Sequence, residues 1–108
     1  MPGGDFRTRV LDAVRSVGAG QVVSYGDIAT QAGHPGAARA VGAVLAACRP
    51  DERLPWWRVV YSDGRLPPGK EREHGRRLAA EGVAVIGGRV AMDGGAMRRT
   101  RSRARRRS

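Results

Sequence analysis

The sequence predicts a mainly α-helical domain with a small amount of β structure. Two helical patterns lie between residues 24 and 48, separated only by the turn His34-Pro35-Gly36, and such an arrangement is a helix-turn-helix. Nearer the other end, two β-branched runs flank Gly87-Gly88, which is a strong hairpin signal. A helix-turn-helix followed by a hairpin is a winged helix-turn-helix, and a length of 108 residues suits one such domain.

The first helix is predicted over residues 5–17 and is interpreted as scaffold. Asp5 is a suitable N-cap, and Gly18 and Gly20 end the pattern. The apolar positions between them recur at helical spacing: Phe6, Val10, Ala13, Val14 and Val17.

The second helix is predicted to begin at Ser24, because Ser24 and Asp27 fit a capping-box variant. Tyr25 then occupies the first helical position, where backbone N–H groups point outward and bind anions. Its phenol can reach a phosphate there or lie flat on the core, and the residues alone leave both interpretations open.

The third helix is predicted from residue 37 to about residue 48. One face carries apolar side chains at helical spacing: Ala37, Ala40, Val41, Val44, Leu45 and Cys48. The opposite face is bare except for one arginine: Arg39, Gly42, Ala43 and Ala46. The second helix of a helix-turn-helix enters a DNA groove, and small side chains allow a close approach. Arg39 would then project toward DNA; the alternative is an ordinary solvated charge.

Residues 55–60, Pro-Trp-Trp-Arg-Val-Val, contain both tryptophans of the chain. Residues 58–61 are typical of a short strand, with the two indoles at its entrance. Trp56 and Trp57 are either core anchors or, in part, a stacking surface for a planar ligand such as a nucleobase.

The remainder of the domain is predicted to hold one helix and the hairpin. Residues 71–81 form a charged helix ended by Gly82, in which Glu73 and Arg77 are an i,i+4 pair. The hairpin strands are predicted at 83–86 and 89–92.

The net charge of +10 is unevenly distributed. Residues 97–108 carry seven arginines and no acid, which leaves +3 for the rest of the chain. We therefore predict a folded domain, residues 1–94, and an Arg-rich tail, residues 95–108, that is disordered in isolation and attracts polyanions. Cys48 is the only cysteine, which excludes an internal disulfide and a multi-cysteine zinc site, and no metal or cofactor is expected.

Three motifs follow one another along the chain: Val-Ser-Tyr-Gly-Asp-Ile-Ala (23–29), Ala-Arg-Ala-Val-Gly (38–42) and Pro-Trp-Trp-Arg-Val-Val (55–60). Over about residues 5–92 the chain resembles the DNA-binding domain of the O6-alkylguanine-DNA alkyltransferases. That family has Pro-Cys-His-Arg-Val-Val at the third motif, and the match is closer to the alkyltransferase-like proteins, in which a Trp replaces the reactive Cys.

The resemblance implies a change of chemistry at the reactive position. Trp56 stands where the family has its nucleophile, Trp57 where it has the base, and Glu81 where it has the glutamate that orients the base. An indole has no usable nucleophile and relays no proton at neutral pH, so the pocket is expected to bind without reacting.

The resemblance also implies roles for other residues. Tyr25 rotates the 3′ phosphate, Arg39 fills the space left in the base stack, and Gly42 and Ala43 lie in the minor groove. The lesion pocket is implied to contain Trp56, Trp57, Val59, Tyr61, Ser62 and Lys70. Relatives place a cation over the alkylated base, for which Lys70 or Arg72 is the candidate here.

The implied function is a monomeric, non-enzymatic damage sensor that binds O6-alkylguanine in duplex DNA, flips the base and directs it to nucleotide excision repair proteins. No apolar run or signal peptide points to a membrane, and a cytoplasmic, nucleoid-associated protein is expected. One alternative is a winged-helix regulator or architectural protein drawn to DNA by its tail. The other is an active alkyltransferase using Cys48, which we expect on the core face of the third helix, some distance in sequence from the pocket and with no obvious base beside it.

Overall fold

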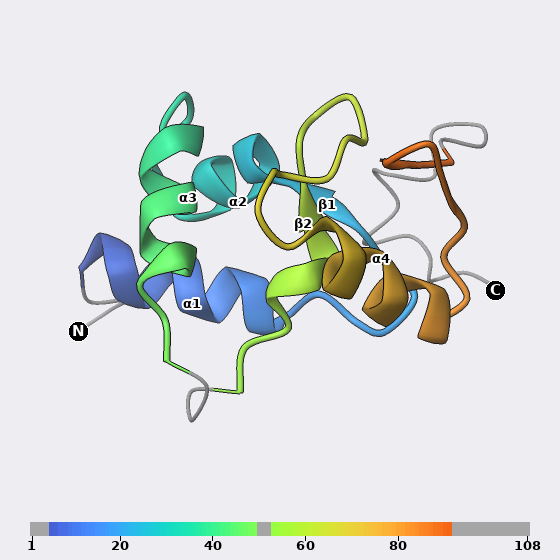
Figure 1. Ribbon diagram of the computed structural model, residues 1–108. Helices are drawn as coiled ribbons and strands as arrows, with labels where there is room; N and C mark the ends of the chain where they lie inside the picture. Colours follow the sequence, from blue (N-terminus) through green and yellow to red (C-terminus); the bar gives the residue numbers. More distant parts are fainter. Residues whose placement is uncertain (1–4, 50–52, 92–108) are drawn as a thin grey trace, which may run out of the picture.

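The computed structural model describes residues 5–49 and 53–91. Its first three helices lie close together (Figure 1) and surround an apolar core, the first core, to which Val10, Val14, Ile28 and Val41 belong. α1 (Phe6–Arg15) starts at Asp5, whose side chain accepts a hydrogen bond from the Thr8 N–H at 2.9 Å. A cap of this kind stabilises a helix by about 1 kcal/mol. The predicted N-cap is confirmed, and the helix is slightly shorter than expected because Ser16 is its C-cap.

A short strand, β1 (Val23–Ser24), leads directly into α2 (Tyr25–Gln31). The predicted capping box is present: the Asp27 N–H donates to Ser24 Oγ at 2.9 Å, and the Ser24 N–H donates to Asp27 Oδ2 at 3.3 Å. Because these bonds fix the start of the helix, Tyr25 lies at its first position, as predicted.

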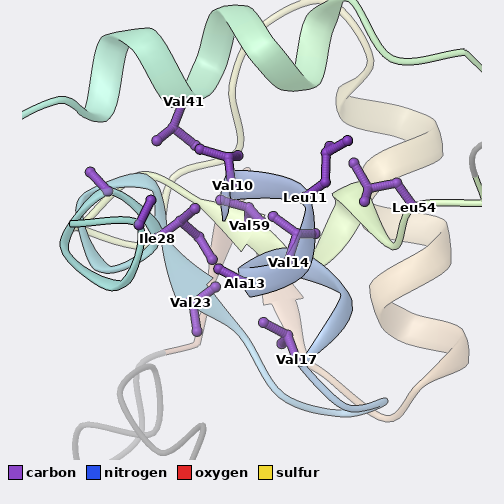
Figure 2. Packing of buried hydrophobic residues seen from close by; sticks show 12 residues of the cluster. Val10, Leu11, Ala13, Val14, Val17, Val23, Ile28, Val41, Leu54 and Val59 are labelled. Atoms are coloured by element: carbon purple, nitrogen blue, oxygen red, sulfur yellow. The ribbon is translucent and has the colours of Figure 1, made fainter. Parts of the chain in front are cut away.

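α3 (Ala38–Ala46) packs across α1 and α2 and completes the helix-turn-helix. Figure 2 shows Val41 of α3 directed toward Val10 of α1, and both side chains are fully buried. Ala40, which the sequence assigned to the core face, is exposed. The prediction was wrong there because α3 meets the core through a narrower stripe, and a single exposed methyl group is normal on a protein surface.

The strand predicted over residues 58–61 is confirmed at its centre, β2 (Val59–Val60), and is shorter than expected. It begins one residue late because Trp56–Arg58 form a 3₁₀ helix, η2, in which the Arg58 N–H donates to the Pro55 carbonyl oxygen at 3.1 Å. It ends one residue early because Tyr61 belongs to the next turn, where the Gly64 N–H donates to the Tyr61 carbonyl oxygen at 2.8 Å. The two indoles lie at the entrance of the strand, as expected.

β2 pairs in parallel with β1, with Val23 opposite Val59 and Ser24 opposite Val60. Val59 and Val60 are both completely buried, Val59 in the first core and Val60 in a second one. This short ladder therefore joins the helix-turn-helix to the rest of the molecule.

The second core lies under α4 (Glu71–Ala80) and the hairpin of β3 (Val85–Ile86) and β4 (Arg89–Val90). Its buried members are Val22, Val60, Leu66, Leu78 and Val90. The predicted hairpin is confirmed, because Gly87 and Gly88 have φ angles of 61° and 77°, which a two-residue turn of this type requires.

Three predictions fall outside the described residues: Met92 as the last strand residue, the domain boundary at residue 94, and the disordered tail from residue 95. Within residues 5–49 and 53–91, no helix is both long enough and apolar enough to cross a membrane.

Candidate nucleic-acid interface

A cavity of about 1210 Å³ lies between α3 and α4. α3 contributes small side chains and Arg39 to one wall, and α4 contributes Glu73, His74 and Arg77 to the other. The two tryptophans of η2 and the loop at residues 67–70 complete the lining. Mixed aromatic and polar linings are typical of ligand sites in proteins.

Most of the predicted site residues line this cavity: Tyr25, Arg39, Gly42, Trp56, Trp57, Tyr61 and Lys70. The structure thus brings together side chains that are far apart in the sequence. Three predicted residues lie elsewhere. Ala43 is exposed on α3 beyond the lining, Val59 is buried in the first core, and Ser62 is exposed on the turn after β2. Arg72 borders a separate cavity on another face of α4.

Trp56 is half-buried and meets two other rings edge-on. Its ring centroid lies 5.0 Å from that of His74 and 5.9 Å from that of Trp57, with interplanar angles of 73° and 87°. Lys70 Nζ lies 5.2 Å from the same centroid, and Arg77 Cζ lies 5.9 Å from it. An exposed cation over an aromatic ring contributes about 0.5–1 kcal/mol. Trp56 therefore presents an aromatic surface in electropositive surroundings.

Beside the tryptophans, Arg58 and Glu81 form an ion pair whose side chains are each 15% exposed. Arg58 Nη2 lies 2.5 Å from Glu81 Oε2, and Arg58 Nη1 donates to the Val17 carbonyl oxygen at 2.8 Å. The Gly20 N–H donates to Glu81 Oε1 at 3.2 Å. The hydrogen bonds from Arg58 are the main reason that the pKa of Glu81 is lowered. The pair anchors the end of α4 to the loop that follows α1.

Glu81 also lies near the indole of Trp57, as the resemblance implied for the glutamate beside the base position. The Trp57 N–H adds to the lowering of the Glu81 pKa, although its geometry falls short of a hydrogen bond. The carboxylate is thus retained, but Arg58 is its principal partner.

His74, which the sequence did not assign to the site, belongs to the α4 wall. It is 2% exposed, and its Nε2 lies 2.8 Å from the Trp57 carbonyl oxygen, so this nitrogen carries a proton and donates. Burial lowers the pKa of His74, which favours the neutral ring. The signal in the sequence was its spacing of four residues from Leu78, which places both on one helix face.

Arg77 was also missed as a site residue, although its predicted pairing is confirmed. Arg77 Nε donates to Glu73 Oε2 at 2.9 Å. The guanidinium carbon lies 4.7 Å from the centroid of Trp57. The i,i+4 spacing predicted the ion pair, but it did not reveal that the pair faces the tryptophans.

Tyr25 lies at the junction of the first core and the cavity. Its ring packs against the core, and its centroid is 5.8 Å from that of Tyr61. Burial, with Tyr61 nearby, raises the pKa of Tyr25 to about 12. The phenol therefore stays protonated and can donate a hydrogen bond to a phosphate. The two interpretations left open by the sequence are compatible.

Cys48 packs against the first core, as expected, and it also lines the cavity. α3 has already ended at Ala46, which lets the half-buried Cys48 touch both the core and the cavity. Its Sγ lies 3.3 Å from the Val44 carbonyl oxygen and donates to it. Within the described ranges, no group of three or more His, Cys, Asp or Glu side chains could hold a metal ion.

The fold and the cavity define a winged helix-turn-helix domain with a pocket beside α3, the second helix of the helix-turn-helix. Residues 5–83 match the family described as 6-O-methylguanine DNA methyltransferase, DNA binding domain. The chain belongs to this family, and the resemblance and the fold class predicted from the sequence are confirmed.

Relatives of this chain include proteins named for base flipping and for alkyl transfer. The DNA base-flipping protein of Escherichia coli (strain K12) is 42% identical over 85 residues, which are 76% of this chain and 65% of that protein. S. pombe Atl1, in a crystal structure with damaged DNA containing O6-carboxymethylguanine, matches with a TM-score of 0.71 and 36% identity over 75% of this chain and 79% of Atl1. Mycobacterium tuberculosis O6-methylguanine methyltransferase matches with a TM-score of 0.62 and 35% identity over 73% of this chain. That match spans only 49% of the methyltransferase.

Proposed function

We propose that this protein is a non-enzymatic sensor of O6-alkylguanine in duplex DNA. The observation that carries the proposal is that Trp56, which the resemblance places at the family's cysteine position, lines the cavity beside α3. An indole offers no nucleophile, but it gives a flipped base a surface to stack on, worth about 1–3 kcal/mol. Such a pocket holds a lesion without reacting with it.

Base flipping by this chain is supported by its relatives. One is named a DNA base-flipping protein, and Atl1 was crystallised with damaged DNA. Extruding a base costs a few kcal/mol, which stacking on Trp56 and contacts with the cavity walls would offset.

We assign the contacts with the DNA backbone and groove to α2 and α3. Tyr25 donates to the 3′ phosphate of the flipped nucleotide, and Arg39 fills the gap in the stack. Gly42 and Ala43 face a minor groove about 6 Å wide. A Cβ at Gly42 would meet no atom within 4 Å, so packing inside the protein does not require glycine there. A close DNA surface accounts for its small size.

We further propose how the sensor works in the cell. It acts as a monomer at the nucleoid, in the cytoplasm, and passes the flipped lesion to nucleotide excision repair proteins. Residues 1–94 form the lesion-binding domain, and the Arg-rich residues 95–108 hold the protein on DNA through phosphates without reading the sequence.

The proposal is tested by the affinity of the full chain for two duplexes that differ only by guanine or O6-methylguanine at one position. We expect a lesion preference of at least tenfold, which equals about 1.4 kcal/mol, measured by fluorescence anisotropy. Equal affinity for both duplexes would reject the sensor. A defined undamaged site recovered by sequence selection would instead support a winged-helix regulator.

The tail makes a separate prediction. Removing residues 97–108 should weaken binding to both duplexes and reduce the slope of log affinity against log salt concentration, because fewer phosphates are neutralised. The lesion preference should remain. A tail in which lysine replaces every arginine is the control, and it should keep most of the salt dependence. Loss of lesion preference on truncation would assign the tail to the site itself.

Alkyl transfer to Cys48 is a second candidate, favoured by the position of Cys48 in the cavity lining. In that reaction the sulfur attacks the alkyl carbon, an S–C bond forms as the C–O6 bond breaks, and guanine leaves and takes up the proton that the thiol gave up. The Cys48 thiol donates to a backbone carbonyl, which requires the protonated form, whereas the thiolate is the nucleophile. Incubation with labelled O6-methylguanine DNA and mass spectrometry of the protein decides the matter, with Cys48→Ser as control. We expect no adduct.

A further inference from the structure

A second cavity, of about 950 Å³, lies between α4 and the hairpin of β3 and β4. Figure 1 shows α3 and the hairpin on opposite sides of α4. Apolar side chains and one glycine form part of the lining: Leu66, Gly75, Ala79, Val83, Ala84 and Val85. This second cavity therefore has an apolar surface of its own, apart from the cavity beside α3.

The second cavity faces away from the proposed DNA-binding site. His74 and Arg77 line only the cavity beside α3. The α-helical repeat of about 3.6 residues per turn places another set of residues on the opposite face of α4. These residues line only the second cavity: Arg72, Gly75, Arg76 and Ala79. A ligand of the second cavity therefore does not compete with DNA for the same face.

Two cations in this lining have no acidic partner. Arg72 and Arg76 are exposed, and among the described residues neither forms an ion pair. The carboxylates nearest in sequence are engaged, because Glu73 accepts from Arg77 at 2.9 Å and Glu71 accepts from a backbone N–H at 3.0 Å. The second cavity therefore offers two unpaired guanidinium groups to a ligand.

The same positions weaken α4 as an isolated helix. Arg72 and Arg76 are four residues apart, and like charges at that spacing repel. Arg72 also lies in the first turn of α4, where the helix dipole disfavours a cation. Gly75 lowers the helix propensity, although a Cβ there would lie at ordinary contact distances of 3.8 Å and 3.9 Å from Leu66 and Val85. The fold requires neither the two charges nor the glycine, and together they keep the cavity open and positive.

We propose that the second cavity binds an acidic segment of another protein, with carboxylates on Arg72 and Arg76 and an apolar side chain against the apolar lining. The inference deepens the proposed function, because a sensor that does not react with a lesion needs another protein to act on it. A guanidinium group binds a carboxylate through two parallel hydrogen bonds. The apolar lining removes a neighbouring apolar side chain from water.

Charge and chemistry favour this occupant over two others. Residues 97–108 of the chain itself carry seven arginines and no acid, so Arg72 and Arg76 repel them. A DNA backbone would bind the two arginines through its phosphates, but it gains nothing from the apolar lining. An acidic segment with an apolar residue uses both features of the cavity.

The test selects peptides from a random phage-displayed library on the full chain. Peptides that also bind Arg76→Glu are removed first, because that variant keeps the arginines of residues 97–108. We expect the remaining peptides to combine acidic residues with an apolar one. The most enriched peptide is then labelled with fluorescein and titrated with each variant by anisotropy. Failure to enrich such peptides would overturn the inference.

Variants assign peptide binding to the second cavity. Arg76→Glu should weaken it about tenfold or more, because like charges across an interface repel. The same variant should melt no lower than wild type, since it replaces a repulsive pair with Arg72 by an attractive one. Arg9→Glu is the matched control, because it reverses one exposed charge on α1, outside both cavities, and should change peptide affinity by less than about twofold.

A second pair of variants tests the shape of the cavity. Gly75→Leu should block peptide binding by filling the space, whereas Gly75→Ala adds only the Cβ that fits and should retain it. Melting temperatures of both show that they fold. Equal peptide binding by wild type and a folded Gly75→Leu would contradict the assignment.

The affinities for duplexes with guanine and with O6-methylguanine separate this inference from the proposed function. Arg76→Glu and Gly75→Leu should keep the lesion preference of wild type. A lesion preference without peptide binding at this cavity would overturn the docking surface and leave the sensor intact. Peptide binding by a protein without lesion preference would overturn the sensor alone. If the O6-methylguanine duplex displaces the peptide, the two ligands share one surface and the inference is wrong.

Discussion

The two walls of the cavity are built in opposite ways. The α3 wall has small side chains such as Gly42 and Ala46 and the exposed Arg39. In the α4 wall the polar groups are already bound: His74 to the Trp57 carbonyl, and Arg77 to Glu73. A bare wall suits contact with the backbone of a large ligand, whereas a wall of fixed groups can hold one base in a defined position. This difference is what the proposed function requires, with groove contact on the α3 side and base recognition on the α4 side.

The largest expected effect comes from removing the anchor of the α4 wall. Arg58→Ala leaves the part-buried Glu81 without its ion-pair partner, and the cost should lie between about 1 kcal/mol for an exposed pair and about 3–5 kcal/mol for a fully buried one. Urea denaturation measures the loss in the free energy of unfolding. Arg65→Ala is the matched control, because the side chains of Arg65 and its partner Asp63 are 58% and 46% exposed, so its removal should cost less than about 1 kcal/mol.

The Arg58–Glu81 pair should also make the free energy of unfolding depend on pH. The pKa of Glu81 in the folded protein is below its ordinary value of 4.5, so the pair contributes fully above pH 4.5 and its contribution is lost as the pH falls through the folded-state pKa. The stability difference between wild type and Arg58→Ala should therefore shrink only below pH 4.5. A constant difference down to pH 2 would mean that Glu81 is not the partner that matters.

Substitution of His74, which lies in the same α4 wall, should lower the free energy of unfolding somewhat less. His74→Leu leaves the buried Trp57 carbonyl without its donor, which costs about 1–3 kcal/mol. Because the folded-state pKa of His74 lies below its ordinary value of 6.5, the contribution of the neutral ring is complete above pH 6.5 and is lost as the pH falls toward the folded-state value. Melting temperatures between pH 5 and 8 measure this slope.

The dependence of melting temperature on pH should disappear in His74→Gln, because glutamine keeps a hydrogen-bond donor but does not titrate. It should persist in His34→Gln, because His34 is exposed on the turn between α2 and α3. A wild-type slope retained in His74→Gln would contradict the assignment.

Substitutions in the α3 wall should weaken DNA binding more than they lower the stability of the fold. Arg39→Ala is expected to weaken binding of the O6-methylguanine duplex by about tenfold, or about 1.4 kcal/mol, because nothing then fills the space left by the flipped base. Its melting temperature should stay near wild type, since Arg39 is exposed. Arg72→Ala, another exposed arginine outside this cavity, should reduce binding far less, and equal losses would point to charge alone.

The smallest expected effect is a gain in stability at Gly42. Gly42→Ala should stabilise the helix by up to about 1 kcal/mol, because the added Cβ meets no atom within 4 Å. Gly42→Leu should also fold, but its side chain would stand between α3 and the groove and weaken DNA binding. Unfolding midpoints and anisotropy on both variants separate these effects. If Gly42→Leu binds DNA as tightly as wild type, α3 does not lie in the groove.

Features set by nearby residues were predictable from the sequence. The Ser24–Asp27 capping box, the Gly87-Gly88 turn and the Glu73–Arg77 pair depend on residues no more than four positions apart, and the structure contains all three. The bare face of α3 was also predictable from helical spacing.

Features set by distant residues were not predictable in the same way. The 3₁₀ helix at Trp56–Arg58 was not predicted, because the sequence placed the two indoles only at the entrance of a strand over residues 58–61. Which face of α4 turns toward Trp56 depends on packing against the second core, so His74 and Arg77 were missed. That Cys48 touches the cavity as well as the core was not predicted either, because the exact end of α3 decides what its side chain touches.

One further consequence follows from the parallel pairing of β1 and β2. Ser24, opposite Val60, is followed at once by Tyr25, while Val59 follows directly after the helical turn that bears Trp56. The distance between the proposed phosphate contact at Tyr25 and the proposed base pocket at Trp56 therefore depends on two residue pairs. A one-residue slip in this ladder would reverse its side chains and move the two positions relative to each other.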